Sequence, residues 1–167
     1  MNRLTLVLLD SLVGEWVGKG RVEYPTIETF DYLETFIVRR DPDLPFLTYE
    51  LQTELVDTDG RTIRKSHWEA GLLRPLKDGT VELSCVHGSG RVETLQGTFT
   101  SQDPLAGKFS LSFQSKMIGN DEQMVSSKRE WTLDGDQFSY EMRMATTNIG
   151  EPTIHLTASL TKEQTHF

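Results

Sequence analysis

The segment Thr153-Ile-His-Leu-Thr-Ala-Ser-Leu-Thr-Lys162 has the composition of a β-strand and carries a single histidine, His155. As the last patterned stretch of the chain, it is predicted to be the closing strand of a barrel. Strict alternation places His155 with the polar residues, on the face opposite Leu156 and Leu160. A one-residue slip would exchange the two faces. Either the strand is bulged beside His155, or the barrel interior is partly polar near its mouth.

Nine other segments have strand composition and precede this one at short intervals. They cover residues 14–24, 30–40, 46–57, 61–74, 80–87, 91–100, 108–115, 124–133 and 137–146. Turn signals such as Asp41-Pro-Asp43 and Lys77-Asp-Gly79 separate several of them. Since no connection is long enough for a crossover helix, the sheet is predicted to be antiparallel.

Ten consecutive antiparallel strands leave two sheet edges, and pairing the first strand with the last removes both. The prediction is therefore an all-β, up-and-down barrel of ten strands, with residues 1–167 as a single domain. Eight strands already leave room for a small ligand, so ten should enclose a cavity. The run Leu4-Thr-Leu-Val-Leu-Leu9 is expected to form a short helix or turn that packs against one barrel end. Residues 25–29 leave no room for a helical lid, so the mouth is expected to be open.

The first strand, residues 14–24, alternates with a period of two and contains Gly14, Trp16, Gly18 and Gly20. These glycines lack the spacing of a nucleotide-binding loop, and no helix follows them. Glycine on the inner face of a strand marks a bend or a bulky group close to the backbone.

The charge balance excludes several classes of partner. Twenty-five acidic residues against 17 basic ones give a formal charge of -8, which disfavours nucleic acid and anionic membranes. The apolar N-terminal run is too short to span a membrane. Cys85 is the only cysteine, so it forms no internal disulfide; a buried, unreactive thiol and a cytoplasmic location are expected. Barrel closure and the acidic surface predict a monomer or a weak homodimer.

The other ionisable residues suggest few catalytic arrangements. His67 is expected on the barrel wall, either facing the ligand or hydrogen-bonded to the wall; His87 is expected in a turn near the mouth, and His166 in the tail. Glu34 and Glu69 are candidates for interior hydrogen bonds. Neither zinc-type Cys/His spacing nor a paired hydrolase serine is evident.

Several motifs together resemble those of the nitrobindins, haem-binding β-barrels shaped like fatty-acid-binding proteins. The first strand matches G-x-W-x-G-x-G and is followed by Tyr24-Pro-Thr-Ile27. The matches continue through the chain with Phe30-Asp-Tyr-Leu-Glu34, His67-Trp-Glu-Ala-Gly71, Arg74-Pro75, Val92-Glu93, Gly97-Thr-Phe99, Tyr140, Met144 and His155-Leu-Thr-Ala-Ser-Leu160. The sequence departs from the family pattern at Val22, where many members have glycine, and at Ile154.

The resemblance implies one ferric haem b per chain, with His155 as the axial iron ligand. It also places Thr26, Ile27, His67 and Met144 at the cofactor. The implied ligands are nitric oxide, bound weakly, and peroxynitrite, isomerised to nitrate. The alternative is a non-enzymatic carrier of a small lipophilic ligand, in which the same barrel holds no haem and His155 faces outward.

Overall fold

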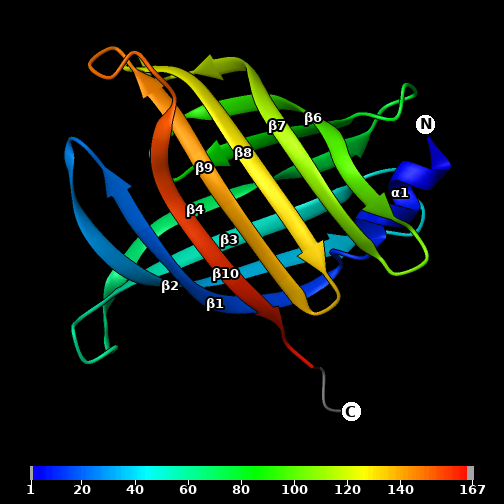
Figure 1. The fold of residues 1–167 in the computed structure, drawn as a ribbon, viewed down its shortest axis with the longest axis horizontal. Coiled ribbons are helices and arrows are strands. Elements are labelled where there is room, and N and C mark those ends of the chain that lie inside the picture. The colour runs from blue at the N-terminus through cyan, green and yellow to red at the C-terminus, as the bar shows by residue number, and fades with distance from the viewer. Residues whose placement is uncertain (1, 165–167) are drawn as a thin grey trace.

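The computed structural model describes residues 2–164, which form one helix and ten strands. The helix is α1 (Arg3–Asp10), and the strands are β1 (Gly14–Tyr24), β2 (Ile27–Arg40), β3 (Leu47–Val56), β4 (Thr62–Pro75), β5 (Val81–His87), β6 (Val92–Asp103), β7 (Lys108–Gly119), β8 (Met124–Asp134), β9 (Gln137–Thr146) and β10 (Thr153–Lys162). Figure 1 shows the strands wrapping around a common interior. The predicted strands all exist, and β1, β9 and β10 have the predicted bounds.

Each strand pairs antiparallel with its neighbours in sequence, and β1 pairs with β10 to close the barrel. The β1–β10 register runs from Trp16 opposite Lys162 to Val22 opposite Leu156. The predicted up-and-down barrel is therefore confirmed.

Helix α1 covers one end of the barrel (Figure 1). Its first turn is capped by the Asn2 side chain, which accepts a hydrogen bond of 3.2 Å from the Thr5 amide. Leu6, Leu8 and Leu9 are buried against the core. The predicted capping helix is confirmed, and it leaves the opposite end as the barrel mouth.

The half of the barrel next to α1 is filled by large side chains. Trp16, Phe36, Phe113, Trp131 and Phe138 belong to one continuous buried cluster. The Trp16 indole donates a 2.8 Å hydrogen bond to the Leu12 carbonyl, which ties β1 to the end of the helical segment. Because this half is packed solid, any ligand space must lie toward the mouth.

Gly20 lies where a side chain would meet an aromatic ring. A Cβ at this position would lie 2.1 Å from Cζ of Tyr32 on β2. The expectation of a bulky group close to a β1 glycine is confirmed, and the group is the ring of Tyr32. Glycine is required at position 18 for a different reason, because a Cβ there would lie 2.1 Å from the Ser159 carbonyl oxygen of β10.

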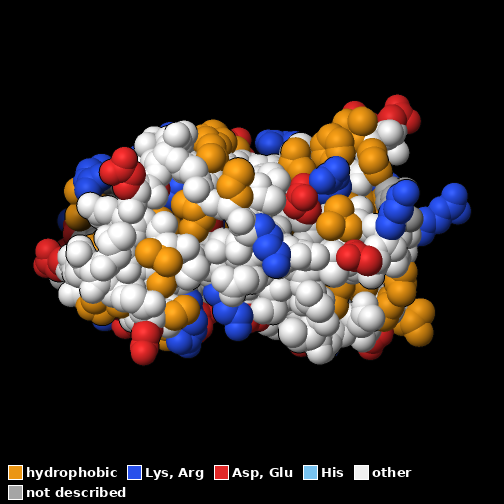
Figure 2. Space-filling model, turned by 90° about the horizontal axis from the view of Figure 1, so that it is seen from above, with side chains coloured by type: hydrophobic (Ala, Val, Ile, Leu, Met, Phe, Trp, Pro, Cys, Tyr) orange, Lys and Arg blue, Asp and Glu red, His pale blue; other side chains and the backbone are white. Residues whose placement is uncertain are grey.

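The mouth has no lid between the first two strands, because only Pro25 and Thr26 connect β1 to β2. On the face shown in Figure 2, acidic and basic side chains are interspersed with polar and apolar ones. In the part of the chain that the structure describes, α1 is far too short to cross a bilayer, and no other helix qualifies.

Candidate functional site

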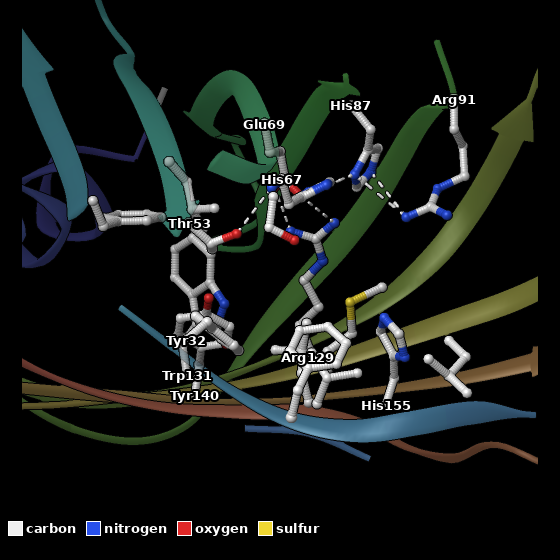
Figure 3. A pocket seen from close by; sticks show the side chains of 18 residues that line it. Tyr32, Thr53, His67, Glu69, His87, Arg91, Arg129, Trp131, Tyr140 and His155 are labelled. Atoms are coloured by element: carbon white, nitrogen blue, oxygen red, sulfur yellow. Dashed lines mark hydrogen bonds and ion pairs between the residues drawn. The ribbon is translucent and has the colours of Figure 1, made fainter. Parts of the chain in front are cut away.

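A cavity of about 850 Å³, counting its opening to solvent, lies in the half of the barrel away from α1. Apolar side chains of Val22, Ile27, Phe30, Met142 and Leu156 form part of its wall. Figure 3 shows that the polar groups gather on two sides, with His155 facing the group of His67, Glu69, His87 and Arg91.

His155 reaches the cavity because β10 is bulged at this residue. Ile154 pairs with Arg143 and Leu156 pairs with Met142, so the register against β9 shifts across His155. As a result, the consecutive residues His155 and Leu156 both line the cavity. Of the two arrangements that the sequence allows, the bulged strand is the one observed.

The imidazole of His155 is held by packing more than by hydrogen bonds. The ring of Tyr24 meets it edge to face, with centroids 5.6 Å apart. Its Nδ1 atom is buried and has no hydrogen-bond partner among residues 2–164. Burial, followed by the nearby charges of Arg91 and His67, lowers the pKa of His155 to about 4. The ring is therefore neutral at physiological pH and has an unused nitrogen.

The opposite wall carries a buried ionic network centred on Glu69. Arg129 Nη1 donates to Glu69 Oε1 at 2.6 Å, and the Tyr49 hydroxyl donates to the same oxygen at 2.5 Å. Burial alone would raise the pKa of Glu69, but Arg129 and the neighbouring histidines His67 and His87 hold it well below its usual value. The expected interior hydrogen bonding of Glu69 is confirmed.

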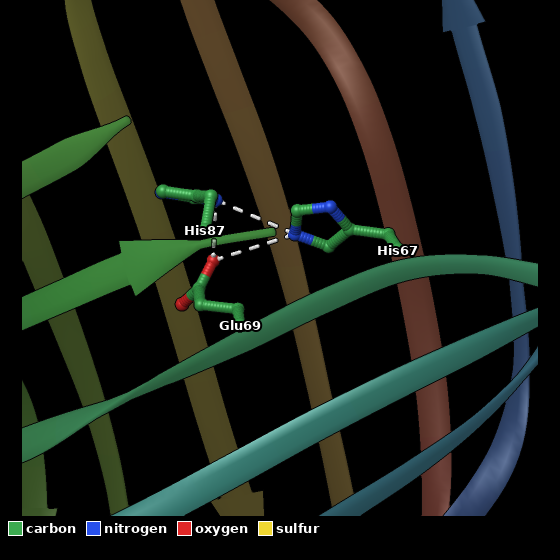
Figure 4. A group of neighbouring side chains, drawn as sticks. All are labelled: His67, Glu69 and His87. Atoms are coloured by element: carbon green, nitrogen blue, oxygen red, sulfur yellow. Dashed lines mark hydrogen bonds and ion pairs between the residues drawn. The ribbon is translucent and has the colours of Figure 1, made fainter. Parts of the chain in front are cut away.

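His87 is part of this network, so its predicted position in a turn is wrong. It is the last residue of β5, where the predicted strand 80–87 also ends, and it is only 2% exposed because its ring lines the cavity and does not project from the turn that follows. Its Nε2 lies 2.9 Å from Glu93 Oε1, and its Nδ1 lies 3.2 Å from Glu69 Oε2. Figure 4 shows how His67 completes the group, with its Nε2 3.4 Å from His87 Nδ1.

A second buried carboxyl lies beside the cavity. The Tyr140 hydroxyl, which lines the cavity, is 2.6 Å from Oε2 and 2.8 Å from Oε1 of Glu34. Burial raises the pKa of Glu34 to about 8. The predicted interior role of Glu34 is therefore also confirmed. Beside Arg129 in the Glu69 network, burial raises the pKa of the Cys85 thiol to about 12, as expected of an unreactive cysteine.

The structure brings only some of the predicted cofactor residues to the cavity. His155, His67 and Ile27 line it. Thr26 is exposed in the β1–β2 turn at the mouth and is not a lining residue. Met144 is buried in a separate cluster with Tyr24, whose hydroxyl donates to the Met144 carbonyl at 3.4 Å. The motif residues Gly14, Trp16, Gly18 and Gly20 shape β1 without lining the cavity. His166 lies outside the described residues.

Sequence reasoning missed Arg91 and Arg129, both of which line the cavity. A signal for Arg129 was present, because alternation along β8 puts it on the same inward face as Trp131 and Leu133. A charged residue at an inward position of a barrel strand requires buried partners. The sequence gives no comparable indication for Arg91, because this residue lies in the turn just before β6 and outside the alternating pattern. Its Nε donates to Glu93 at 2.8 Å.

Comparisons with known proteins agree with this geometry. The family described as THAP4-like, heme-binding beta-barrel domain matches residues 5–162. A protein named peroxynitrite isomerase from Mycobacterium leprae (strain TN) is 35% identical over 160 residues, covering 95% of each chain. One of the same name from Nocardia farcinica (strain IFM 10152) is 36% identical over 162 residues, covering 95% of this chain and 90% of that protein.

A solved structure shows the same barrel. The crystal structure of Rv2717c from M. tuberculosis superposes with a TM-score of 0.82 at 31% identity, covering 96% of this chain and 98% of that one. Together, the family match and the relatives confirm the resemblance stated from the motifs. The chain belongs to the THAP4-like, heme-binding beta-barrel family, the nitrobindins.

Proposed function

We propose that this barrel binds ferric haem b, one per chain, with His155 as the axial ligand of the iron. The observation that carries the proposal is the placement of His155, which a bulge turns into the cavity as a neutral imidazole. Neutral imidazole is the form that binds metal ions. The family description and the names of the relatives support the same cofactor.

The residues around His155 fit a large, flat and mostly apolar group. Ile27, Phe30, Met142 and Leu156 provide apolar surface in the same cavity. The buried Nδ1 of His155 has no hydrogen-bond partner among residues 2–164, which supports an imidazole that is available to a cofactor. Axial histidines commonly donate a hydrogen bond from their second nitrogen. Here the edge-to-face contact with the Tyr24 ring orients the imidazole, and the Tyr24 hydroxyl donates to the Met144 carbonyl at 3.4 Å.

We further propose that the protein binds nitric oxide and isomerises peroxynitrite to nitrate. When bound, ferric haem supplies a Lewis-acidic iron at which the O–O bond of peroxynitrite can rearrange. The chain itself contributes hydrogen-bond donors, because the guanidinium groups of Arg91 and Arg129, each paired with a carboxylate, border the cavity. His67 provides a polar wall, and Thr26 lies at the entrance, where it is proposed to adjust how the cofactor is seated.

Stopped-flow decay of peroxynitrite, with nitrate and nitrite yields, tests this activity. Haem-loaded protein is expected to accelerate the decay and raise the nitrate yield over the haem-free chain. His67→Leu and Thr26→Ala should change the rate by no more than about tenfold, or roughly 1.4 kcal/mol. If the haem-loaded protein is no faster than the haem-free chain, the catalytic proposal fails and haem binding alone remains. A purified chain with no Soret band after haem addition would favour the lipophile carrier.

We also propose that the protein is a monomer or a weak homodimer and that it works in the cytoplasm. The closed sheet offers no strand edge for pairing, which supports a monomer or a weak dimer, and light scattering at micromolar concentration tests this. A tight higher oligomer would contradict it. The single cysteine, Cys85, supports a reducing, cytoplasmic environment.

A further inference from the structure

Three acceptor-type atoms converge on one point of the cavity wall. They are Nε2 of His67 and Oε2 of Glu69, both on β4, and Nδ1 of His87 at the end of β5 (Figure 4). His87 Nδ1 is 3.4 Å from His67 Nε2 and 3.2 Å from Glu69 Oε2, and the remaining separation is 3.9 Å. Such close approach requires a proton or a cation between the atoms.

The protonation of His87 is constrained from its other side. Its Nε2 lies 2.9 Å from Glu93 Oε1, which can only accept a hydrogen bond when ionised. Nε2 therefore carries the ring proton. In the neutral imidazole the lone pair of Nδ1 faces Glu69 and His67, and Arg91 Nη2 lies 3.3 Å from the same atom. Carboxylate–histidine pairs of this kind hold metal-binding imidazoles in the correct tautomer.

The separations between the three atoms fit a tetrahedral metal ion. Bonds of about 2.0–2.1 Å to nitrogen and oxygen at tetrahedral angles place neighbouring ligand atoms about 3.3–3.4 Å apart. Two of the observed separations, 3.2 and 3.4 Å, match this spacing, and the third, 3.9 Å, needs only a small rotation of the partly exposed His67 ring.

The surroundings of the group also suit a cation. Glu69 Oε1 accepts from Arg129 and Tyr49, and Oε2 accepts one longer hydrogen bond of 3.3 Å from Arg129 Nη2, so Oε2 keeps a lone pair for a further partner. Three carboxylates, Glu69, Glu93 and Asp121, face the two guanidinium groups of Arg91 and Arg129. With neutral histidines, the network has one excess negative charge. The three ligand residues line the cavity, so a fourth position faces its interior (Figure 3).

We propose that His67 Nε2, His87 Nδ1 and Glu69 Oε2 form a binding site for one divalent transition-metal ion, zinc or ferrous iron, with an open coordination position toward the cavity. Two histidines and a carboxylate are the ligand set of catalytic zinc sites and of non-haem iron sites. The site is separate from His155, which lies across the barrel on β10, and it does not depend on haem binding. Water or a small anion would occupy the open position.

Cobalt(II) titration of the haem-free chain, residues 1–167, tests the site, because tetrahedral cobalt absorbs in the visible range. One equivalent is expected to give d–d bands that zinc then abolishes. His67→Ala should weaken cobalt binding by about 100-fold or more, and Glu93→Gln, which frees the His87 ring, by about 10–100-fold. His155→Ala is the matched control, since it removes a histidine from the same cavity, and it should bind cobalt like the wild type.

Several results would overturn the proposal. Absence of d–d bands at millimolar cobalt would show that protons alone bridge the three atoms. Equal binding by His67→Ala and the wild type would show that cobalt binds elsewhere, as would loss of binding in His155→Ala. The His67 side chain is 39% exposed, so its replacement should leave the fold intact, which far-UV circular dichroism verifies. His87 is buried, and His87→Gln is the replacement that retains its polarity there.

Discussion

The ring of Tyr24 meets the imidazole of His155 nearly at a right angle, 85°, with centroids 5.6 Å apart. Tyr24 is the last residue of β1, and its hydroxyl lies 3.4 Å from both the Met144 carbonyl and the Thr146 hydroxyl of β9. This ring therefore spans β10 and fixes the orientation of the bulged histidine. This contact gives the tyrosine of the Tyr-Pro-Thr-Ile motif a structural role, which is to orient His155.

Tyr24→Ala should reduce haem affinity by about tenfold, because the imidazole loses an aromatic contact worth on the order of 1 kcal/mol. Tyr24→Phe is the control, since it keeps the ring and removes only the long hydroxyl contacts, and it should bind haem like the wild type. Haem titration followed by absorbance measures both. Equal affinity of the alanine variant and the wild type would show that the ring does not position His155.

Haem affinity should be constant from pH 8 to about 5 and fall only as the pH approaches 4. The ligand must be neutral, and the pKa of His155 is lowered to about 4, so protonation competes with the iron only near and below that value. An unperturbed histidine would instead lose affinity near pH 6. Titrations at each pH, with circular dichroism to monitor folding, would contradict the account if affinity fell already at pH 6.

Glu34→Gln should stabilise the protein at alkaline pH and have little effect at pH 5. The pKa of Glu34 is raised from 4.5 to about 8, so the folded state holds this proton more tightly than the unfolded chain. That stability is complete below pH 4.5 and is lost as the pH rises toward 8, by up to a few kcal/mol in order of magnitude. Urea unfolding at pH 5 and 8.5 measures the difference between variant and wild type. A pH-independent difference would count against a protonated Glu34.

Gly20→Ala should lower the free energy of unfolding by about 1–3 kcal/mol, because the new methyl group displaces the Tyr32 ring. Gly150→Ala is the matched control, since a Cβ there meets nothing within 4 Å and the backbone φ is not positive. Urea denaturation compares the two variants. Equal stability of both would mean that the Tyr32 ring moves away at no cost.

The fold could be predicted from the sequence because the strands of a barrel are encoded by residues that are close together in the chain. Alternation and turn residues are set by neighbours along the chain, so β1, β9 and β10 were located to the residue. The bulge at His155 left two alternatives open, since the same letters fit a straight and a bulged strand. Only the pairing of Ile154 and Leu156 with β9 decides between them.

The ionic network could not be predicted, because its partners are distant in the chain. Arg129 and Glu69 meet across the barrel interior, sixty positions apart. His67 and His87 likewise come together only through the pairing of β4 with β5. Their spacing in the sequence does not match a known metal-binding motif. The inward position of His87 was missed for a related reason. The Gly-Ser-Gly sequence that follows it indicates a turn, whereas its ring is held inside the barrel by the contact with Glu93.

The central claim is that His155 holds the haem, and a haem titration of His155→Ala tests it most directly. His67→Ala serves as the matched control, because it removes a histidine from the same cavity. Wild type and His67→Ala are expected to take up one haem per chain with a strong Soret band, whereas His155→Ala should lose tight uptake. Unchanged Soret intensity and affinity in His155→Ala would contradict the account.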